Sequence, residues 1–145
     1  MRQEVGEVLA VFTSQKANSQ RIEEKCLELD SKGILGDKFY AKDMQRSVLL
    51  TSLESYALAL QEGIEMPNGA LGENILIDYN PYALAVGSQI AIGEVVVEIT
   101  QNCTICNHLS FIDKRLPTLL KDDRGVFVKV IKSGFIEKGN KLYLL

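Results

Sequence analysis

The chain has 145 residues, of which 46% are hydrophobic and 24% are charged, and its formal net charge is −3. A chain of this size and composition is typical of one globular domain, which buries a sufficient core without a disulfide or a metal. The acidic balance argues against nucleic acid as the main partner, because a surface that follows phosphates is usually basic.

The first segment, "MRQEVGEVLAVFTSQK", carries Glu4 and Glu7 and only a short apolar run. These features are typical of neither a signal peptide nor a membrane anchor. We therefore expect a cytoplasmic protein with no membrane partner.

Apolar and polar residues alternate with period two over much of the chain, which predicts strands. The first predicted strands cover residues 3–12 and 25–30, and "RSVLLTS" (46–52) is a short apolar strand. A helix follows it to about residue 63, with Thr51 as its cap and Glu54 as the capping-box partner. Its apolar residues are spaced at i, i+3, i+4 and i+7, which predicts a face packed in the core. These residues are Leu53, Tyr56, Ala57 and Leu60.

The second half of the chain again predicts strands. "ILID" is one, and "SQIAIGEVVVEIT" predicts two strands joined by a tight hairpin at Gly93-Glu94. "RGVFVKVIKSGFIEKGNKLYLL" predicts a further strand-turn-strand series with "EKGN" as the turn. Many strands and one long helix predict a mainly β (α+β) fold, a β-barrel-like single domain over residues 1–145 with short helical segments.

Function is expected in the loops at one end of such a barrel. Glycine and polar residues mark the loops 33–46, 67–74 and 101–110, together with the approach to Arg124-Gly125.

Two of the three cysteines stand in a Cys-x-x-Cys spacing at the end of a predicted strand, and the only histidine, His108, follows two residues later. Three chemistries use such a cluster: a metal site, a dithiol redox pair, or one nucleophilic sulfur. A zinc shell needs four ligands, and its soft candidates are Cys26, Cys103, Cys106 and His108. A thioredoxin-like dithiol opens a helix in a βαβ unit, a pattern that is not visible here.

The individual residues carry further expectations. Cys26 lies within a predicted strand, where we expect a small buried residue. His108 is at most an assisting base. The glycines of "GILGDK", "GALGEN" and "RGVF" let the backbone approach a ligand, while Asn74, Arg46 and Arg124 offer amide and guanidinium groups suited to an anionic oxygen.

In their order and approximate spacing, four segments resemble MOSC domains, the family named for the C-terminal domain of molybdenum cofactor sulfurases. The segments are "GILGDKFYAKDMQRSVLLTSLES", "GALGENILID", "VGSQIAIGEVVVEITQNCTICNHL" and "RGVFVKVIKSGFI". The resemblance covers nearly the whole chain and implies a β-barrel-like domain with a pocket for a phosphorylated pterin-type cofactor. It also implies a cysteine that carries sulfur as a persulfide or ligates molybdenum. The family's functional cysteine follows the "TQ" pair by five positions, which is Cys106 here.

The resemblance thus gives Cys106 the catalytic role, with Cys103 and His108 as auxiliary residues and with Arg46, Asn74 and Arg124 as cofactor-binding residues. Cys103 could resolve a persulfide into a disulfide. No pyridoxal-phosphate desulfurase region is present in the sequence, so we expect a cysteine desulfurase as sulfur donor. The expected acceptor is a molybdoenzyme or a cofactor-biosynthesis protein.

Three function classes remain open on this basis. The first is a sulfur carrier or cofactor-binding domain of molybdenum metabolism, with sulfurtransferase-type activity. The second is a component of a molybdenum-cofactor-dependent reductase that acts on N-hydroxylated small molecules. The third is a metal-stabilised binding module that uses Cys103, Cys106 and His108.

Overall fold

The computed structural model describes residues 2–16, 20–104 and 109–145 of the chain. The strands are β1 (Gln3–Thr13), β2 (Ile22–Glu24), β3 (Cys26–Asp30), β4 (Gly33–Ile34), β5 (Val48–Ser52), β6 (Ile75–Ile77), β7 (Gln89–Ile92), β8 (Val95–Asn102), β9 (Val126–Lys132), β10 (Gly134–Glu137) and β11 (Lys141–Leu144). The helices are α1 (Leu53–Gln61), α2 (Leu109–Ile112) and α3 (Leu116–Leu119). Strands dominate, as the alternating sequence pattern predicts.

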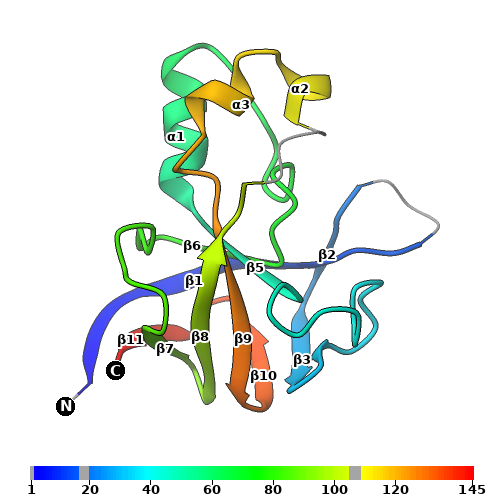
Figure 1. The fold of residues 1–145 in the computed structure, drawn as a ribbon, viewed down its shortest axis with the longest axis vertical. Helices are drawn as coiled ribbons and strands as arrows, with labels where there is room; N and C mark the ends of the chain where they lie inside the picture. Colours follow the sequence, from blue (N-terminus) through cyan, green and yellow to red (C-terminus); the bar gives the residue numbers. More distant parts are fainter. Residues whose placement is uncertain (1, 17–19, 105–108) are drawn as a thin grey trace.

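The main sheet closes on itself. Within the described residues its strands follow the order β11-β7-β8-β9-β5-β6-β1, and β11 pairs again with β1. These seven described strands form a barrel, and β2 adds to the end of β1 (Figure 1). Closure leaves no unpaired edge around the ring. The predicted mainly β, barrel-like fold is confirmed.

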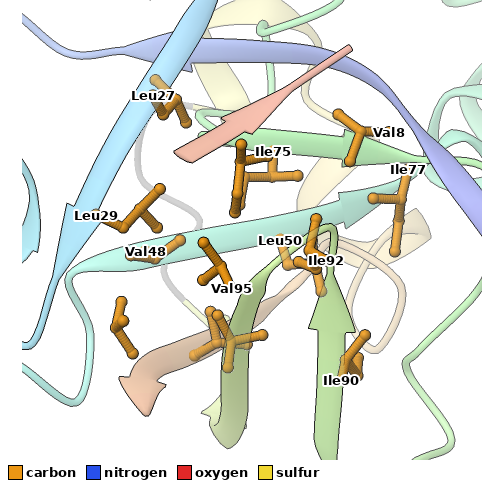
Figure 2. Packing of buried hydrophobic residues seen from close by; sticks show 14 of the residues in the cluster. Val8, Leu27, Leu29, Val48, Leu50, Ile75, Ile77, Ile90, Ile92 and Val95 are labelled. Carbon is orange, nitrogen blue, oxygen red and sulfur yellow. The ribbon is translucent and has the colours of Figure 1, made fainter. Parts of the chain in front are cut away.

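Aliphatic side chains fill the barrel. In β8 the residues Val95, Val97 and Ile99 are buried while the residues between them are partly exposed, which is the period of two that a strand imposes. Leu50 of β5 and Ile75 of β6 belong to the same cluster (Figure 2). The alternation in the sequence therefore reflects the one face of each strand that points into the barrel.

A small second sheet packs against this core. Its strands follow the order β10-β3-β4 among the described residues. Leu27 and Leu29 of β3 and Ile136 of β10 are buried in the cluster that fills the barrel, where Figure 2 shows the two leucines. The second sheet is thus part of the same core.

The described helices gather on one side of the barrel, beyond the carboxyl end of β8 in Figure 1. A second apolar cluster joins them to the outer faces of β1 and β6. Its buried members are Ala10, Phe12, Tyr56, Ala59, Ile64, Leu71, Leu76, Leu109, Leu116 and Leu120. None of the helices in the described part of the chain combines the length and apolar character needed to cross a bilayer.

The predicted cap of α1 is wrong by one residue. Ser52 is the N-cap, and its hydroxyl accepts a hydrogen bond from the Glu54 backbone N–H at 3.1 Å. Thr51 instead belongs to β5, where its hydroxyl donates to the Arg124 carbonyl at 3.0 Å. Glu54 therefore stands too early in the helix for a capping box, and its carboxylate accepts from Asn80 at 2.8 Å.

The predicted core face of α1 is confirmed at Tyr56 and wrong at its other three residues. Leu53 and Leu60 are 44% and 56% exposed, and Ala57 is exposed as well. The buried residues of the helix are Ser55, Tyr56 and Ala59. Hydrogen bonds explain this orientation of the helix. The Ser55 hydroxyl bonds to the Tyr82 hydroxyl at 2.6 Å and to the Asp123 carbonyl, and these bonds direct Ser55 toward the protein interior.

The predicted hairpin is confirmed. β7 and β8 pair antiparallel on either side of Gly93-Glu94, and Gly93 adopts a φ of 58°. A backbone with positive φ at the first turn position matches the right-handed twist of the flanking strands. Asn140 N donates to the Glu137 carbonyl at 3.1 Å, which closes the predicted "EKGN" turn.

Cys26 is exposed, so the expectation of a small buried residue is wrong. In β3 the alternation directs Leu27 inward and Cys26 outward. Partial burial of the sulfur, followed by the charges of Glu137 and Glu28, raises the pKa of Cys26. A raised pKa lowers the fraction of Cys26 that is thiolate at a given pH.

Candidate functional site

The loops that the sequence singles out meet in the folded chain, around buried polar side chains. The contacts that join them run from Asn74 to Asp37, from Arg124 to Leu71, and from Cys103 to Gly125. We use "polar cluster" below for Arg21, Asp37, Glu73, Asn74 and Arg124. The cluster lies between the barrel core and the apolar cluster under the helices, because Ile75 follows it into the first and Tyr56 connects it to the second.

Asp37 is the hub of the polar cluster. Its Oδ1 accepts hydrogen bonds from the backbone N–H of Ser14 at 2.5 Å and from Asn74 Nδ2 at 3.5 Å. Its Oδ2 accepts from the backbone N–H of Phe39 at 3.0 Å. Asp37 is buried, and a carboxylate with several N–H donors is held in a fixed orientation.

Asn74 joins two strands of the barrel. Its Oδ1 accepts from the backbone N–H of Leu49 in β5 at 3.0 Å, and its Nδ2 donates to the Phe12 carbonyl of β1 at 3.3 Å. With the bond to Asp37, protein groups use both ends of this amide. Asn74 therefore positions the cluster, and its contact with a cofactor stays a prediction.

Glu73 is fully buried beside Tyr56. Its Oε2 accepts from the Tyr56 hydroxyl at 2.6 Å and from the Gly69 backbone N–H at 3.1 Å. Burial raises the pKa of Glu73, while the bonds from Tyr56 and Gly69 and the charge of Arg21 oppose this rise. The other oxygen, Oε1, is buried and has no hydrogen-bond partner in the described structure.

The Arg21 guanidinium lies near the carboxyl groups of Asp37 and Glu73. Its Nη1 is 3.8 Å from Asp37 Oδ1, and this buried nitrogen makes no hydrogen bond in the described structure. The guanidinium lies 5.7 Å from the centre of the Phe39 ring. Burial has the largest effect on the pKa of Arg21 and lowers it. The charges of Asp37 and Glu73 raise this pKa, and the charge of Arg124 lowers it. Because a guanidinium stays protonated in proteins, the site keeps this charge.

Arg124 is buried and fastens the 67–74 loop to the start of β9. Its Nε and Nη2 donate to the Leu71 carbonyl at 3.3 and 3.0 Å. The next residue must be small, because a Cβ on Gly125 would lie 2.8 Å from Thr51 Oγ1 and 3.0 Å from the Leu50 carbonyl oxygen. At Gly125 the backbone therefore passes close to β5, which requires the glycine that the sequence has there.

The cysteine-bearing segment begins next to this arginine. Cys103 is buried, and its backbone N–H donates to the Gly125 carbonyl at 2.9 Å. Cys106 and His108, the predicted catalytic and assisting residues, lie outside the described residues. Their roles stay predictions.

Arg46 belongs to the outer surface. Its side chain is exposed, and the guanidinium lies over the Phe127 ring of β9, 5.2 Å from the ring centre. No hydrogen bond or ion pair joins it to the polar cluster in the described part of the structure. The structure therefore brings Asn74 and Arg124 together with Asp37, and leaves Arg46 on a separate surface.

The zinc alternative receives no support from the residues that the structure describes. Among them, no group of three or more histidines, cysteines or acidic residues could hold a metal ion. Cys26 is exposed on the small sheet, whereas Cys103 is buried after β8. Since Cys106 and His108 are outside the described residues, a site that includes them stays a prediction.

The sequence interpretation missed Arg21, Asp37 and Glu73 as site residues. The glycine motifs "GILGDK" and "GALGEN" already contain the two acids, so the signal for them was present. Arg21 stands in no motif. Its position follows from the pairing of β2 with the end of β1, which only the fold reveals.

The arrangement is suited to a ligand that carries negative charge. Two guanidinium groups lie near two carboxyl groups, and burial disfavours the charged form of one of these, Glu73. Guanidinium groups bind phosphate and other anionic oxygens through several parallel N–H donors.

The described structure thus places loops with buried charged groups beside the start of a cysteine-bearing segment on a closed barrel. The family model described as MOSC domain matches residues 33–143 of the chain. The chain belongs to the MOSC domain family, and the resemblance noted in the sequence is confirmed.

Solved structures share the fold. The chain is similar to the YuaD protein from Bacillus subtilis, with a TM-score of 0.80 and 16% identity over 99% of this chain and 98% of that chain. It is also similar to YiiM from Geobacillus stearothermophilus, with a TM-score of 0.71 and 17% identity over 100% of this chain and 75% of that chain. For YiiM from Escherichia coli the TM-score is 0.72 and the identity 18%, over 100% of this chain and 70% of that chain. No curated protein sequence matches the chain.

Proposed function

We propose that this MOSC domain acts in molybdenum-cofactor metabolism as a sulfur carrier and cofactor-binding domain, with Cys106 as the residue that accepts sulfur. One observation carries the proposal: the hydrogen bond from Cys103 N to the Gly125 carbonyl, at 2.9 Å, anchors the start of the cysteine-bearing segment next to Arg124. Cys103 and the polar cluster thus share one region of the fold.

The residues of the cluster fit the phosphorylated pterin part of such a cofactor. Arg21 has a buried N–H group with no hydrogen-bond partner in the described structure, and a phosphate oxygen is a suitable acceptor for it. Arg124 adds a second positive charge, while Asn74 and Asp37 hold the loops in place. When bound, the cofactor would supply a molybdenum centre that receives sulfur or a thiolate ligand.

The chemistry of Cys106 is a sulfur exchange without net oxidation. Its thiolate attacks the outer sulfur of a persulfide on a cysteine desulfurase; the donor's S–S bond breaks, a new S–S bond forms on Cys106, and the donor cysteine leaves as a thiolate. Cys103 could instead discharge the new persulfide by attacking its inner sulfur: the persulfide S–S bond breaks, a Cys103–Cys106 disulfide forms, and the outer sulfur leaves as sulfide. Burial of Cys103 restricts that reaction and supports an auxiliary role.

The acceptor of the sulfur is a molybdoenzyme or a cofactor-biosynthesis protein in this proposal, and the compartment is the cytoplasm. A reducing compartment keeps thiols free for such a cycle.

Mass spectrometry of the intact protein tests the assignment. The chain is incubated with a cysteine desulfurase and cysteine, and the sulfur added to each variant is measured. We expect that Cys106→Ser abolishes loading, whereas Cys103→Ser and the exposed control Cys26→Ser load like the unmodified chain. Equal loss in the Cys103 and Cys106 variants, or stoichiometric zinc that leaves with either thiol, would contradict the proposal.

A further inference from the structure

The loop between β4 and β5 carries exposed basic and apolar side chains. Phe39 and Met44 are 42% and 50% exposed, and Lys38, Lys42 and Arg46 are exposed as well. We use "basic face" below for these five residues. Neither of the two apolar clusters formed by the described residues includes Phe39 or Met44. Aromatic, methionine and arginine side chains are enriched where proteins bind one another, so this surface is a candidate interface.

The charge of the basic face differs from that of the whole chain. The chain has a formal net charge of −3, whereas Asp43 is the only exposed acid within the described residues 35–46. Asp37 belongs to the same loop but is buried. A positive surface on an acidic protein attracts an acidic surface of a partner and orients it toward this loop.

Two of the cations lie over aromatic rings. Lys38 Nζ is 5.0 Å from the centre of the Phe39 ring, and the Arg46 guanidinium is 5.2 Å from the centre of the Phe127 ring. Cations are attracted to the face of such rings, which restricts their side chains. Side chains that are already restricted lose less conformational entropy when a partner binds.

The basic face borders the strand that leads to the cysteine-bearing segment. The Thr100 hydroxyl, near the end of β8, hydrogen-bonds to the carbonyl of Gln45, which stands next to Arg46 in the chain. Phe127, whose ring Arg46 covers, pairs with Gln101 of β8. A protein bound to the basic face therefore lies beside the end of β8, from which the chain continues to the cysteines.

We infer that the basic face docks the protein that donates sulfur, through an acidic surface of the donor that carries an apolar side chain. The inference rests on the proposed function and adds where its donor binds. Sulfur transfer between two proteins requires direct contact, because the thiolate of one must reach the outer sulfur of the persulfide on the other.

The charges favour a protein over an anionic membrane as the occupant. Lys38, Lys42 and Arg46 are fewer cations than the roughly four to eight that are typical of a surface for anionic lipids. The negative charge of the whole chain also opposes its approach to an extended anionic surface.

Sulfur loading from two donors tests the inference. The first is a cysteine desulfurase that has been loaded with persulfide and separated from free cysteine, and the second is cysteine persulfide, a small molecule. With either donor the Cys106 thiolate attacks the outer sulfur, the donor's S–S bond breaks, and the donor leaves as a thiolate. Intact-mass spectrometry gives the initial rate at rising donor concentration. Only the protein donor needs a docking surface, so the comparison isolates docking from the chemistry of the thiol.

Two double variants change the basic face. Lys38→Glu with Lys42→Glu reverses two charges, and Phe39→Ala with Met44→Ala removes the apolar side chains. We expect each to raise the desulfurase concentration for half-maximal rate about tenfold and to leave loading from cysteine persulfide unchanged. Higher ionic strength should slow loading of the unmodified chain by the desulfurase, and should affect the charge variant less.

Matched double variants elsewhere serve as controls. Lys138→Glu with Lys141→Glu reverses two exposed charges near β11, and Leu53→Ala with Leu60→Ala removes two side chains of α1 that are 44% and 56% exposed. Both should load like the unmodified chain from either donor. Circular dichroism verifies the fold of every variant.

Equal loading of all variants by the desulfurase would overturn the inference while sulfur acceptance by Cys106 stands. Loss of loading from both donors would also overturn it, since the residues then act on the thiol and not on docking. Binding to phosphatidylserine vesicles, or self-association, that only the charge variant loses while its loading is unchanged would assign the face to a membrane or to a second copy. If the unmodified chain accepts sulfur from neither donor, the sulfur-carrier proposal itself fails.

Discussion

Glu73 and Ile75 stand two residues apart in the chain and are both fully buried, yet they belong to different regions. Ile75 enters the apolar core of the barrel, whereas Glu73 belongs to the polar cluster. Burying an aliphatic side chain stabilises the fold by about 1.5–3 kcal/mol. Burying a carboxyl group opposes folding unless hydrogen bonds compensate for the lost water, and one oxygen of Glu73 lacks such a bond in the described structure.

The barrel core stabilises the fold, whereas the polar cluster holds the groups that are candidates for chemistry. Every described strand of the ring contributes aliphatic residues to the barrel core. The polar cluster then sits on a frame that is already rigid, so it can hold groups in unfavourable surroundings. Side chains in such surroundings mark candidate functional positions.

The largest effect is expected in the barrel. Ile75→Ala leaves a cavity among residues that cannot easily close it, so we expect a loss of about 2–5 kcal/mol in the free energy of unfolding. Urea denaturation measures it. As a control, Ile131→Ala changes an isoleucine of β9 that is 50% exposed, and a surface change of this kind stays within about 0.5 kcal/mol. Similar losses in the two variants would contradict the assignment of the core.

A smaller loss is expected at the border of the two regions. Asn74→Ala removes the acceptor for the Leu49 N–H and the donor to the Phe12 carbonyl. Leaving these groups buried and unsatisfied predicts a loss of about 1–3 kcal/mol in the same denaturation assay. The control is Asn102→Ala, an exposed residue at the end of β8. If both asparagine variants unfold at the same urea concentration, Asn74 is not a structural link between β1 and β5.

The third prediction concerns how stability depends on pH. Burial raises the pKa of Glu73 above its ordinary value of 4.5, so the folded chain holds this proton at pH values where the unfolded chain has released it. Stability from this group is complete below about pH 4.5 and falls as pH rises toward the folded-state pKa. Glu73→Gln removes that loss, so its stability relative to the unmodified chain should increase from pH 4.5 to neutral pH. A relative stability that decreases over this range would mean that the fold favours the carboxylate.

The strands and the Gly93 turn could be predicted because their cause is local: one inward residue in every two, and one glycine with positive φ. The orientation of α1 could not. Ser52 and Thr51 are both good caps, and the choice between them depends on the bond from Thr51 to Arg124, 73 residues away. The buried face of the helix is set in the same way, by contacts of Ser55 with distant loops.

The site shows the same limit on inference from sequence. Asp37 and Glu73 each follow a glycine in a predicted loop, so the sequence alone could have identified both as candidate site residues. Arg21 carries no local signal, because its place depends on the fold. The exposure of Cys26 was readable, since the alternation that buries Leu27 and Leu29 directs the residue before them outward.

The smallest effect on stability is expected at the exposed ion pair of Asp113 and Arg115. The pKa of Asp113 is shifted in the opposite direction to that of Glu73. Side-chain hydrogen bonds from Arg115, followed by a bond from its backbone N–H, lower the pKa of Asp113 to about 2. In Arg115→Gln the backbone bond remains, so the pKa should rise only part of the way toward 3.8, as NMR titration of the carboxyl carbon can measure. The stabilisation from a lowered pKa is present above pH 3.8 and disappears as pH falls through about 2, so at neutral pH its loss should be small because water screens exposed charges. The two acids thus respond oppositely to pH: a charged partner on the surface favours the carboxylate of Asp113, and burial disfavours that of Glu73. If Arg115→Gln instead left the pKa of Asp113 near 2, the backbone bond alone would hold the carboxylate, and the contrast would lie in hydrogen bonding rather than in charge.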